Sequence, residues 1–248
     1  MTRPRVLVVR SGANPFVSVG PSGSVEVVEI VSHEILPVTP PPDALRDPAN
    51  LAVFTSQVAV ERLREDAELA SRFRGAAASA TIAAVGPVTA EALGEIGLAP
   101  ALVAEGSGEA LLDRLPARLD RWRILHLCGE DAAPDLADGL HRRGAHVESV
   151  VIYRKAARPR DAGLARDIVE RPFAAFCATS PSAAAWLFEG LPADAAARLR
   201  ATPAVVLGRF TRRMLEAHGV ERVEATSEPR FPAALARLEE LAAPAGAA

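Results

Sequence analysis

An internal repeat constrains the fold of this chain more than any single motif. Three pairs of segments match, in the same order, in the two halves of the sequence. They are AVGPVTAEALGEIG at 84–97 with VLGRFTRRMLEAHG at 206–219, Thr55-Ser56 with Thr179-Ser180, and RVLVVR at 5–10 with RILHLC at 123–128. The spacing between partners differs slightly from pair to pair, as loop insertions would cause. We infer that the chain consists of two similar halves.

Each half alternates short apolar segments with amphipathic ones. Runs of Val, Ile, Leu and Ala bounded by Gly or Pro predict strands that are buried on both faces. These runs cover 6–9, 25–31, 51–54, 81–85, 101–103, 124–127, 146–152, 173–177, 204–207 and 222–225. Helical periodicity covers 58–69, 90–96, 133–142, 183–188 and 212–218, and Gly97, Gly144 and Gly219 are placed to end helices. The alternation predicts an α/β fold with two similar parallel-sheet domains that arose by internal duplication.

Two segments have the composition of linkers, one rich in proline at 37–42 and one charged at 154–160. If both cross between domains, the middle of the chain forms one domain and its two ends combine into the other. The predicted domains are therefore a discontinuous α/β domain of 1–35 and 157–248 and an inserted α/β domain of 39–150, with linkers at 36–38 and 151–156. Two linkers side by side would make a hinge, with a cleft between the domains.

Composition excludes several classes of protein. A net charge of −3 argues against a dedicated nucleic-acid-binding protein, which needs a basic face. Two cysteines exclude a disulfide scaffold, and no His or Cys spacing suits zinc, so we expect no metal. The chain has neither GxGxxG nor a P-loop, which mark nucleotide cofactors. No uncharged stretch reaches the roughly 20 apolar residues of a membrane span, so we expect a cytoplasmic protein without membrane contact.

The repeated motifs follow strands, where open α/β sheets bind their ligands. Gly86 permits a tight turn before a helix, and the free N–H groups of a first helical turn attract anions. Ser56 and Ser180 come directly after strands and are expected to be N-caps. Ser or Thr at a helix start is a cap in most proteins, so Ser56 and Thr89 also have a purely structural interpretation. Duplication alone would preserve the pairing of Thr89 with Thr211.

Arg10 and Tyr153 are candidates of another kind. Arg10 ends the first strand, where its repeat partner is Cys128, so the duplicated core does not require an arginine there. An arginine at a strand end can pair with a carboxylate. Tyr153 ends the strand that enters the second linker. Packing is the commoner role of a tyrosine in a strand, but its expected place beside the hinge favours a functional role.

Taken together, the ordered motifs resemble those of the uroporphyrinogen-III synthase family over nearly the whole chain. They are RVLVVR at 5–10, VFTSQVAVERL at 53–63, AVGPVTAEALGEIGLAP at 84–100, GSGEALL at 106–112, ILHLCGE at 124–130, GAHVESVVIYRKA at 144–156, TSPSAAAWL at 179–187 and VLGRFTRRMLEAHGV at 206–220. The resemblance implies two α/β domains joined by a two-stranded ladder, with the active site in the cleft. It implies a lyase that closes the linear tetrapyrrole hydroxymethylbilane to uroporphyrinogen III and inverts ring D through a spiro intermediate.

The same resemblance implies site residues and partners. Tyr153 matches the family tyrosine thought to assist loss of the substrate hydroxyl. The residues implied to bind the substrate carboxylates or shape the cleft are Arg10, Ser56, Gly86, Thr89, Gly129, Ser180, Ser182, Gly208, Arg209 and Thr211. The reaction needs no metal or cofactor, and we expect a monomer that takes its substrate from hydroxymethylbilane synthase in a transient contact.

The chain departs from the family pattern at two places. The segment SGANPFVSVGPSGS at 11–24 is rich in Gly, Pro and Ser where the family usually has a helix. Arg209 follows Gly208 where the family usually has proline, and its charge suits a substrate carboxylate.

Two other functions remain open from the sequence. One is a non-catalytic, two-lobed binding protein for an anionic ligand, and the other is a regulatory protein descended from the enzyme. Tyr153 distinguishes them from an enzyme, because pure binding should tolerate its loss.

Overall fold

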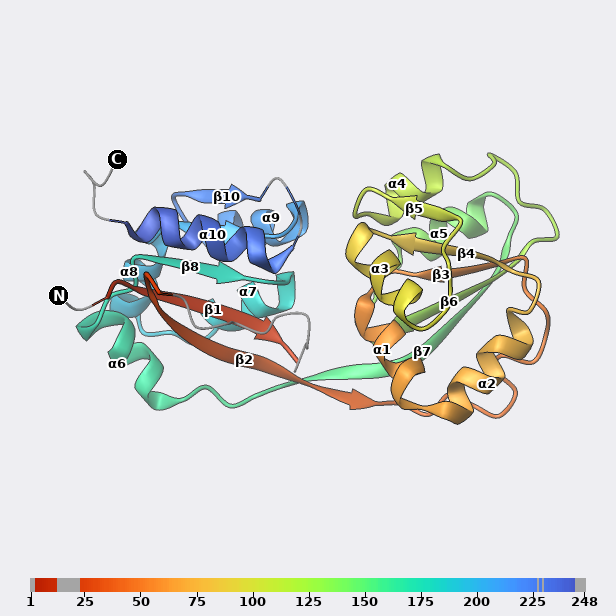
Figure 1. The fold of residues 1–248 in the computed structure, drawn as a ribbon, viewed down its shortest axis with the longest axis horizontal. Coiled ribbons are helices and arrows are strands. Elements are labelled where there is room, and N and C mark those ends of the chain that lie inside the picture. The colour runs from red at the N-terminus through yellow and green to blue at the C-terminus, as the bar shows by residue number, and fades with distance from the viewer. Residues whose placement is uncertain (1–2, 13–22, 227, 229, 244–248) are drawn as a thin grey trace. The chain divides into compact units, whose positions relative to one another are not determined.

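The computed structural model describes residues 3–12, 23–226, 228 and 230–243. Most of the Gly-, Pro- and Ser-rich segment at 11–24 therefore lies outside the described residues. The chain forms two compact units (Figure 1). Unit 1 consists of Met1–Ile35 and Ala156–Ala248, and unit 2 of Leu36–Lys155.

Unit 1 is a parallel sheet between two helical layers. Its strands are β1 (Arg5–Ser11), β2 (Glu26–Pro37), β8 (Ala175–Ala178), β9 (Ala204–Val206) and β10 (Val223–Ala225), in the order β10-β9-β8-β1-β2. One face carries α6 (Ala162–Glu170), α7 (Pro181–Phe188), α8 (Ala193–Ala201) and α9 (Arg209–Ala217), and the other carries α10 (Phe231–Ala242). Leu7 and Val9 pack under α7, whereas Val6 and Val8 pack under α10. This alternation is what a strand buried on both faces requires.

Unit 2 is built in the same way. Its strands are β3 (Leu51–Phe54), β4 (Thr81–Val85), β5 (Leu102–Ala104), β6 (Arg123–Gly129) and β7 (His146–Ala157), in the order β5-β4-β3-β6-β7. Its helices are α1 (Gln57–Glu65), α2 (Ala67–Ala76), α3 (Pro87–Glu95), α4 (Gly108–Asp113) and α5 (Asp135–Arg142). The helices α4 and α5 pack on one face of the sheet, and α1 contacts α2 and α3 as well as β3 and β6.

The two units share their strand order and a detail of their register. Pairing between β1 and β2 shifts between Arg10 and Ser11, and pairing between β6 and β7 shifts between Cys128 and Gly129. Each shift is a β-bulge, in which one strand carries an extra residue. The shared topology agrees with the mixed, mostly parallel α/β fold expected from the sequence. The duplication itself stays a prediction.

The ten strands expected from the apolar runs are all present, but the helix expected at 58–69 is wrong in one respect. It is two helices, α1 and α2, separated by Asp66 in an extended conformation (φ −116, ψ 97). The Asp66 carboxylate accepts a hydrogen bond from the backbone N–H of Leu69 at 2.9 Å and so begins α2. Capping by Asp66 outweighs the apolar periodicity that continues through it.

Candidate functional site

Tyr153 lies on β7 directly opposite Gly129 of β6, at the bulge of unit 2. Its side chain is buried, with 4% of its surface exposed. A Cβ atom added to Gly129 would lie 2.5 Å from Cε2 and 2.9 Å from the hydroxyl oxygen of Tyr153. The phenol ring therefore occupies the space that any other side chain at 129 would fill. Gly129 was expected to bind the substrate or to shape the cleft, and in the structure its missing side chain makes room for the ring of Tyr153.

Burial raises the pKa of Tyr153 above its ordinary value of 10.0, and this is the largest influence on it. A hydrogen bond with the Ser56 side chain acts in the opposite direction, while the negative charge of Asp131 raises the pKa further. The phenol therefore keeps its proton at neutral pH. It can donate a hydrogen bond to a reacting group, but it is a weaker acid than a free phenol.

Ser56 is the N-cap of α1, and its hydroxyl accepts a hydrogen bond from the backbone N–H of Val58 at 3.1 Å. The cap expected from the sequence is confirmed, and the same hydroxyl is the hydrogen-bond partner of Tyr153. Ser56 thus connects the start of α1 to the phenol.

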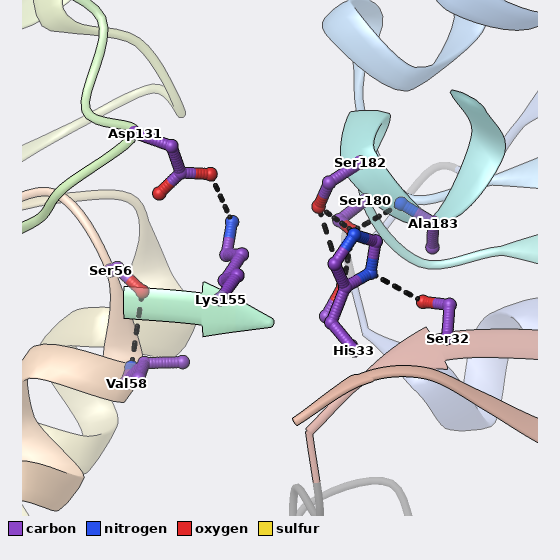
Figure 2. Close-up of polar contacts among 10 residues, drawn as sticks. Ser32, His33, Ser56, Val58, Asp131, Lys155, Ser180, Ser182 and Ala183 are labelled. Atoms are coloured by element: carbon purple, nitrogen blue, oxygen red, sulfur yellow. Dashed lines mark hydrogen bonds and ion pairs between the residues drawn. The ribbon is translucent and has the colours of Figure 1, made fainter. Parts of the chain in front are cut away.

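Lys155 and Tyr153 are two residues apart on β7 and so point to the same face of the strand. Lys155, the only lysine of the sequence, forms an ion pair with Asp131 at 2.9 Å (Figure 2). Asp131 lies two residues after the end of β6. Sequence reasoning missed this pair, although Lys155 lies within a motif that carries the family resemblance.

His126 and Cys128 lie on β6, the strand that pairs with β7. The Nε2 atom of His126 is 3.1 Å from the hydroxyl of Thr55, the residue before Ser56. Burial lowers the pKa of His126 to about 4 and raises that of Cys128 to about 11. At neutral pH both groups are uncharged, so His126 supports the Thr55-Ser56 turn and Cys128 is not a thiolate nucleophile.

Unit 1 carries a cluster of three serine hydroxyls at the start of α7. Ser180 is the N-cap of α7, and its hydroxyl accepts from the backbone N–H of Ala183 at 3.2 Å. It lies 3.1 Å from the hydroxyl of Ser182 (Figure 2), and Ser11 of β1 lies 3.2 Å from Ser180 and 3.3 Å from Ser182. The structure therefore brings the predicted residues Ser180 and Ser182 together and adds Ser11.

The bulge of unit 1 places Ser32 and His33 beside this cluster. Ser32 is fully buried, and its hydroxyl contacts the carbonyl oxygen of Arg10 and Nδ1 of His33, both at 2.9 Å. Ser11 is the register partner of His33. No sequence motif singled out Ser32 or His33, because the matched segment in this region ends at Arg10.

Arg10 is already paired with an acid. Its guanidinium donates to the carboxylate of Glu29 and to the carbonyl oxygen of Gly12. Arg10 and Ser11 are neighbours on β1 and so point to opposite faces of the strand. A substrate carboxylate would have to replace Glu29 as the partner of Arg10.

The glycine and threonine motifs begin α3 and α9. Gly86 is the N-cap of α3 with φ 113, and Gly208 is the N-cap of α9 with an extended φ of −165. Thr89 and Thr211 are not caps, because each is the third residue of its helix; both are buried. Each threonine lies in its own helix rather than in the serine cluster or beside Tyr153.

Arg209 begins α9 and stacks on the ring of Phe210, with its guanidinium carbon 5.0 Å from the ring centroid. Phe210 is 46% exposed. This stacking keeps the Arg209 charge at the surface beside an aromatic face.

Two features are absent from the described residues. No three His, Cys, Asp or Glu side chains in this part of the chain come together as metal ligands would. Likewise, none of the helices in the described ranges is both long and apolar enough to cross a membrane.

The chain is thus a two-unit parallel α/β protein with hydroxyl, amide and phenol donors on its strands and at its helix starts. The family model described as uroporphyrinogen-III synthase HemD matches residues 22–236. The chain belongs to the uroporphyrinogen-III synthase family, whose members act in porphyrin biosynthesis.

Solved structures agree in fold. A mutant uroporphyrinogen III synthase of the extremely thermophilic bacterium Thermus thermophilus is 24% identical, with a TM-score of 0.67 over 95% of this chain and 98% of that one. The uroporphyrinogen-III synthetase of Helicobacter pylori is 17% identical, with a TM-score of 0.60 over 97% and 100%. No curated protein matches the chain.

Proposed function

We propose that this chain is a uroporphyrinogen-III synthase, a lyase that converts hydroxymethylbilane to uroporphyrinogen III with inversion of ring D. The observation that carries the proposal is Tyr153, a buried phenol seated on Gly129 and hydrogen-bonded to Ser56. It stands at the position of the family tyrosine thought to assist the reaction.

The proposed reaction balances as a loss of water. The hydroxyl on the ring A methylene leaves with a proton, and an azafulvenium cation remains. The substituted α-carbon of ring D attacks this cation and forms the spiro intermediate. In that intermediate the bond between ring D and the methylene that joined it to ring C breaks, which leaves a second azafulvenium cation on ring C. The other α-carbon of ring D attacks this cation, then loses its proton and restores the pyrrole.

Tyr153 donates a hydrogen bond to the departing hydroxyl in this scheme. Because its pKa is raised, the phenol stays protonated throughout the neutral range and is always available as a donor. The electron-rich pyrroles supply most of the driving force for ionisation, so the protein contributes mainly by positioning the substrate. We expect Tyr153→Phe to lower kcat about 10²-fold, the lower end of general acid–base effects.

The substrate is a polyanion, and each unit has donors suited to carboxylates. In unit 1 these are the hydroxyls of Ser180 and Ser182 and the N-terminal turn of α9 with Arg209 and Thr211. In unit 2 they are Ser56 and the N-terminal turn of α3 after Gly86. Helix N-termini bind anions through backbone N–H groups, so the net charge of −3 is no obstacle. Arg10 joins them if it exchanges Glu29 for a substrate carboxylate.

The remaining parts of the proposal concern the setting of the reaction. We infer that the protein is a cytoplasmic monomer. The reaction needs no metal or cofactor, because the electron-rich pyrroles themselves supply the electrons for the new bonds. Its unstable substrate comes from hydroxymethylbilane synthase through a transient contact.

A coupled assay tests the proposal. Hydroxymethylbilane is generated in place by its synthase, the protein is added, and the oxidised products are separated into isomers I and III. Spontaneous closure gives isomer I, so a reaction without the protein serves as the blank for each reaction with it. Isomer III from wild type, with a large loss in Tyr153→Phe, supports the enzyme and the tyrosine's role.

The other outcomes also have distinct meanings. Isomer III that is undiminished in Tyr153→Phe keeps the enzyme and rejects Tyr153 as the catalytic donor. Isomer I alone from folded protein supports the alternative, a binding or regulatory protein for an anionic ligand.

A further inference from the structure

The ion pair of Lys155 with Asp131 lies on the same side of unit 2 as the phenol of Tyr153. Tyr153 and Lys155 are two residues apart on β7, so both side chains point to one face of the strand. From that face Lys155 reaches Asp131, with Nζ 2.9 Å from Oδ2 (Figure 2). The Asp131 carboxylate is therefore held on the face of β7 that carries the phenol.

A tight turn also ties Asp131 to Tyr153 through the backbone. The N–H of Ala132 donates to the carbonyl oxygen of Gly129 at 3.1 Å and closes this turn. Glu130 and Asp131 are at its corner. The N–H of Glu130 donates to the carbonyl oxygen of Tyr153 at 3.0 Å. The turn is thus bonded directly to the residue that carries the phenol, and it begins at the glycine against which the phenol ring packs.

The Asp131 carboxylate has one oxygen to spare. Oδ2 is paired with Lys155, whereas Oδ1 accepts no hydrogen bond from the described residues. The Asp131 side chain is 49% exposed, against 21% for Lys155. In the part of the chain that the structure describes, Asp131 is also the one carboxylate whose charge raises the pKa of Tyr153. An accessible carboxylate oxygen therefore lies within electrostatic reach of the phenol.

The proposed reaction creates a positive charge beside this phenol. When the C–O bond of the ring A hydroxymethyl group breaks, both bonding electrons leave with the oxygen, which takes a proton and departs as water. Ring A and its methylene remain as the azafulvenium cation. A charge that is already fixed where the cation develops lowers the barrier, because it need not reorganise during the reaction.

We propose that Asp131 stabilises this cation, with its free oxygen facing ring A as the hydroxyl departs and its other oxygen held by Lys155. This inference rests on the proposed function. Asp131 takes no proton and forms no covalent bond in this role, so the balance of the reaction is unchanged. Lys155 is a positioning residue, because it acts on the cation only through Asp131.

Variants at the turn separate this role from a purely structural ion pair. Asp131→Asn keeps the shape of the side chain and removes its charge. It should lower kcat about tenfold with KM within about twofold, because the cation is absent from the bound ground state. Asp131→Glu keeps the charge and should regain most of the lost activity. Glu130→Gln, which removes an exposed acid from the same turn, is the matched control and should leave both constants unchanged.

Lys155→Met breaks the same ion pair but keeps the carboxylate. If Asp131 stabilises the cation, this variant loses much less kcat than Asp131→Asn, because the negative charge is still beside ring A. If the ion pair only holds the turn in place, the two variants are equally impaired, since each breaks the same bridge.

The constants are measured by isomer separation, with prepared hydroxymethylbilane at varied concentration and thermal unfolding as a check on each variant. Wild-type kcat in folded Asp131→Asn, or equal losses in Asp131→Asn and Lys155→Met, overturns the proposal and leaves the synthase intact. Wild-type protein that forms no isomer III overturns the proposed function itself, and this inference with it. If Asp131→Asn does not fold, Asp131→Ser replaces it with the same expected and contrary results.

A spectroscopic measurement tests the electrostatic link without catalysis. Tyr153 is the only tyrosine of the sequence, so the ultraviolet absorbance of its phenolate reports its titration alone. Loss of the negative charge in Asp131→Asn should shift the midpoint of this titration to lower pH, whereas Glu130→Gln should leave it in place. A midpoint that is the same in Asp131→Asn and wild type overturns the proposal, because the charge of Asp131 would then not reach the phenol.

Discussion

His126 makes the stability of unit 2 depend on pH in a way that can be worked out from the structure. Only 2% of its surface is exposed, and burial lowers its pKa from 6.5 to about 4. Between these two pH values the unfolded chain binds a proton that the folded chain excludes. The stabilisation from keeping His126 neutral is therefore complete above pH 6.5 and is lost as the pH falls through this window toward 4.

The size of the effect follows from the two pKa values. At pH 5 the unfolded imidazole is mostly protonated, and the folded one is mostly neutral. Linkage then lowers the free energy of unfolding by about 2 kcal/mol relative to pH 8. His126→Gln keeps a polar partner for Thr55 and removes the titration. The stability deficit of this variant should therefore shrink by about 2 kcal/mol between pH 8 and pH 5.

Denaturant titration followed by tryptophan fluorescence measures this difference. The sequence has two tryptophans, and Trp186→Phe leaves Trp122, which packs against the core of unit 2, as the only reporter. Wild type and His126→Gln are compared in this background, with the exposed His146→Gln as control. Parallel pH dependences in wild type and His126→Gln would refute the reasoning, because the buried histidine would then titrate normally.

Three further predictions concern the site. Gly129→Ala places a Cβ 2.5 Å from the ring of Tyr153 and should lower kcat at least tenfold by displacing the phenol. Gly75→Ala is the control, because its Cβ meets nothing within 4 Å, and it should leave steady-state kinetics unchanged. Gly86→Ala should cost about 1–2 kcal/mol in denaturant titration because φ is 113, whereas Gly208→Ala, with φ −165, should cost far less. Because the pKa of Tyr153 is raised, the pH–rate profile should show no loss of kcat from phenol ionisation between pH 7 and 9.

The sheet was the most predictable part of the fold. Strands buried on both faces consist of continuous apolar runs, and each of these runs forms a strand. The break between α1 and α2 was not predictable from periodicity, because the apolar positions continue from Leu63 to Leu69 across it. Asp66 ends one helix and caps the next, and only the capping chemistry of Asp66 could have indicated the break.

The site was predictable only where local chemistry determines it. Ser56 and Ser180 follow buried strands and precede helices, so their role as caps follows from sequence order. The contact of Tyr153 with Gly129 depends on a register shift, which is a property of strand pairing and has no local signature. The register shift in unit 1, which places His33 opposite Ser11, likewise has no signature in the sequence.

The distribution of product isomers tests the central claim most directly. A fixed supply of hydroxymethylbilane is divided among reactions with increasing amounts of the wild-type protein, and isomers I and III are quantified in each. If the protein is a uroporphyrinogen-III synthase, the fraction of isomer III rises with protein concentration until isomer I is nearly absent. Folded protein that leaves isomer I at the protein-free level at every concentration would contradict it.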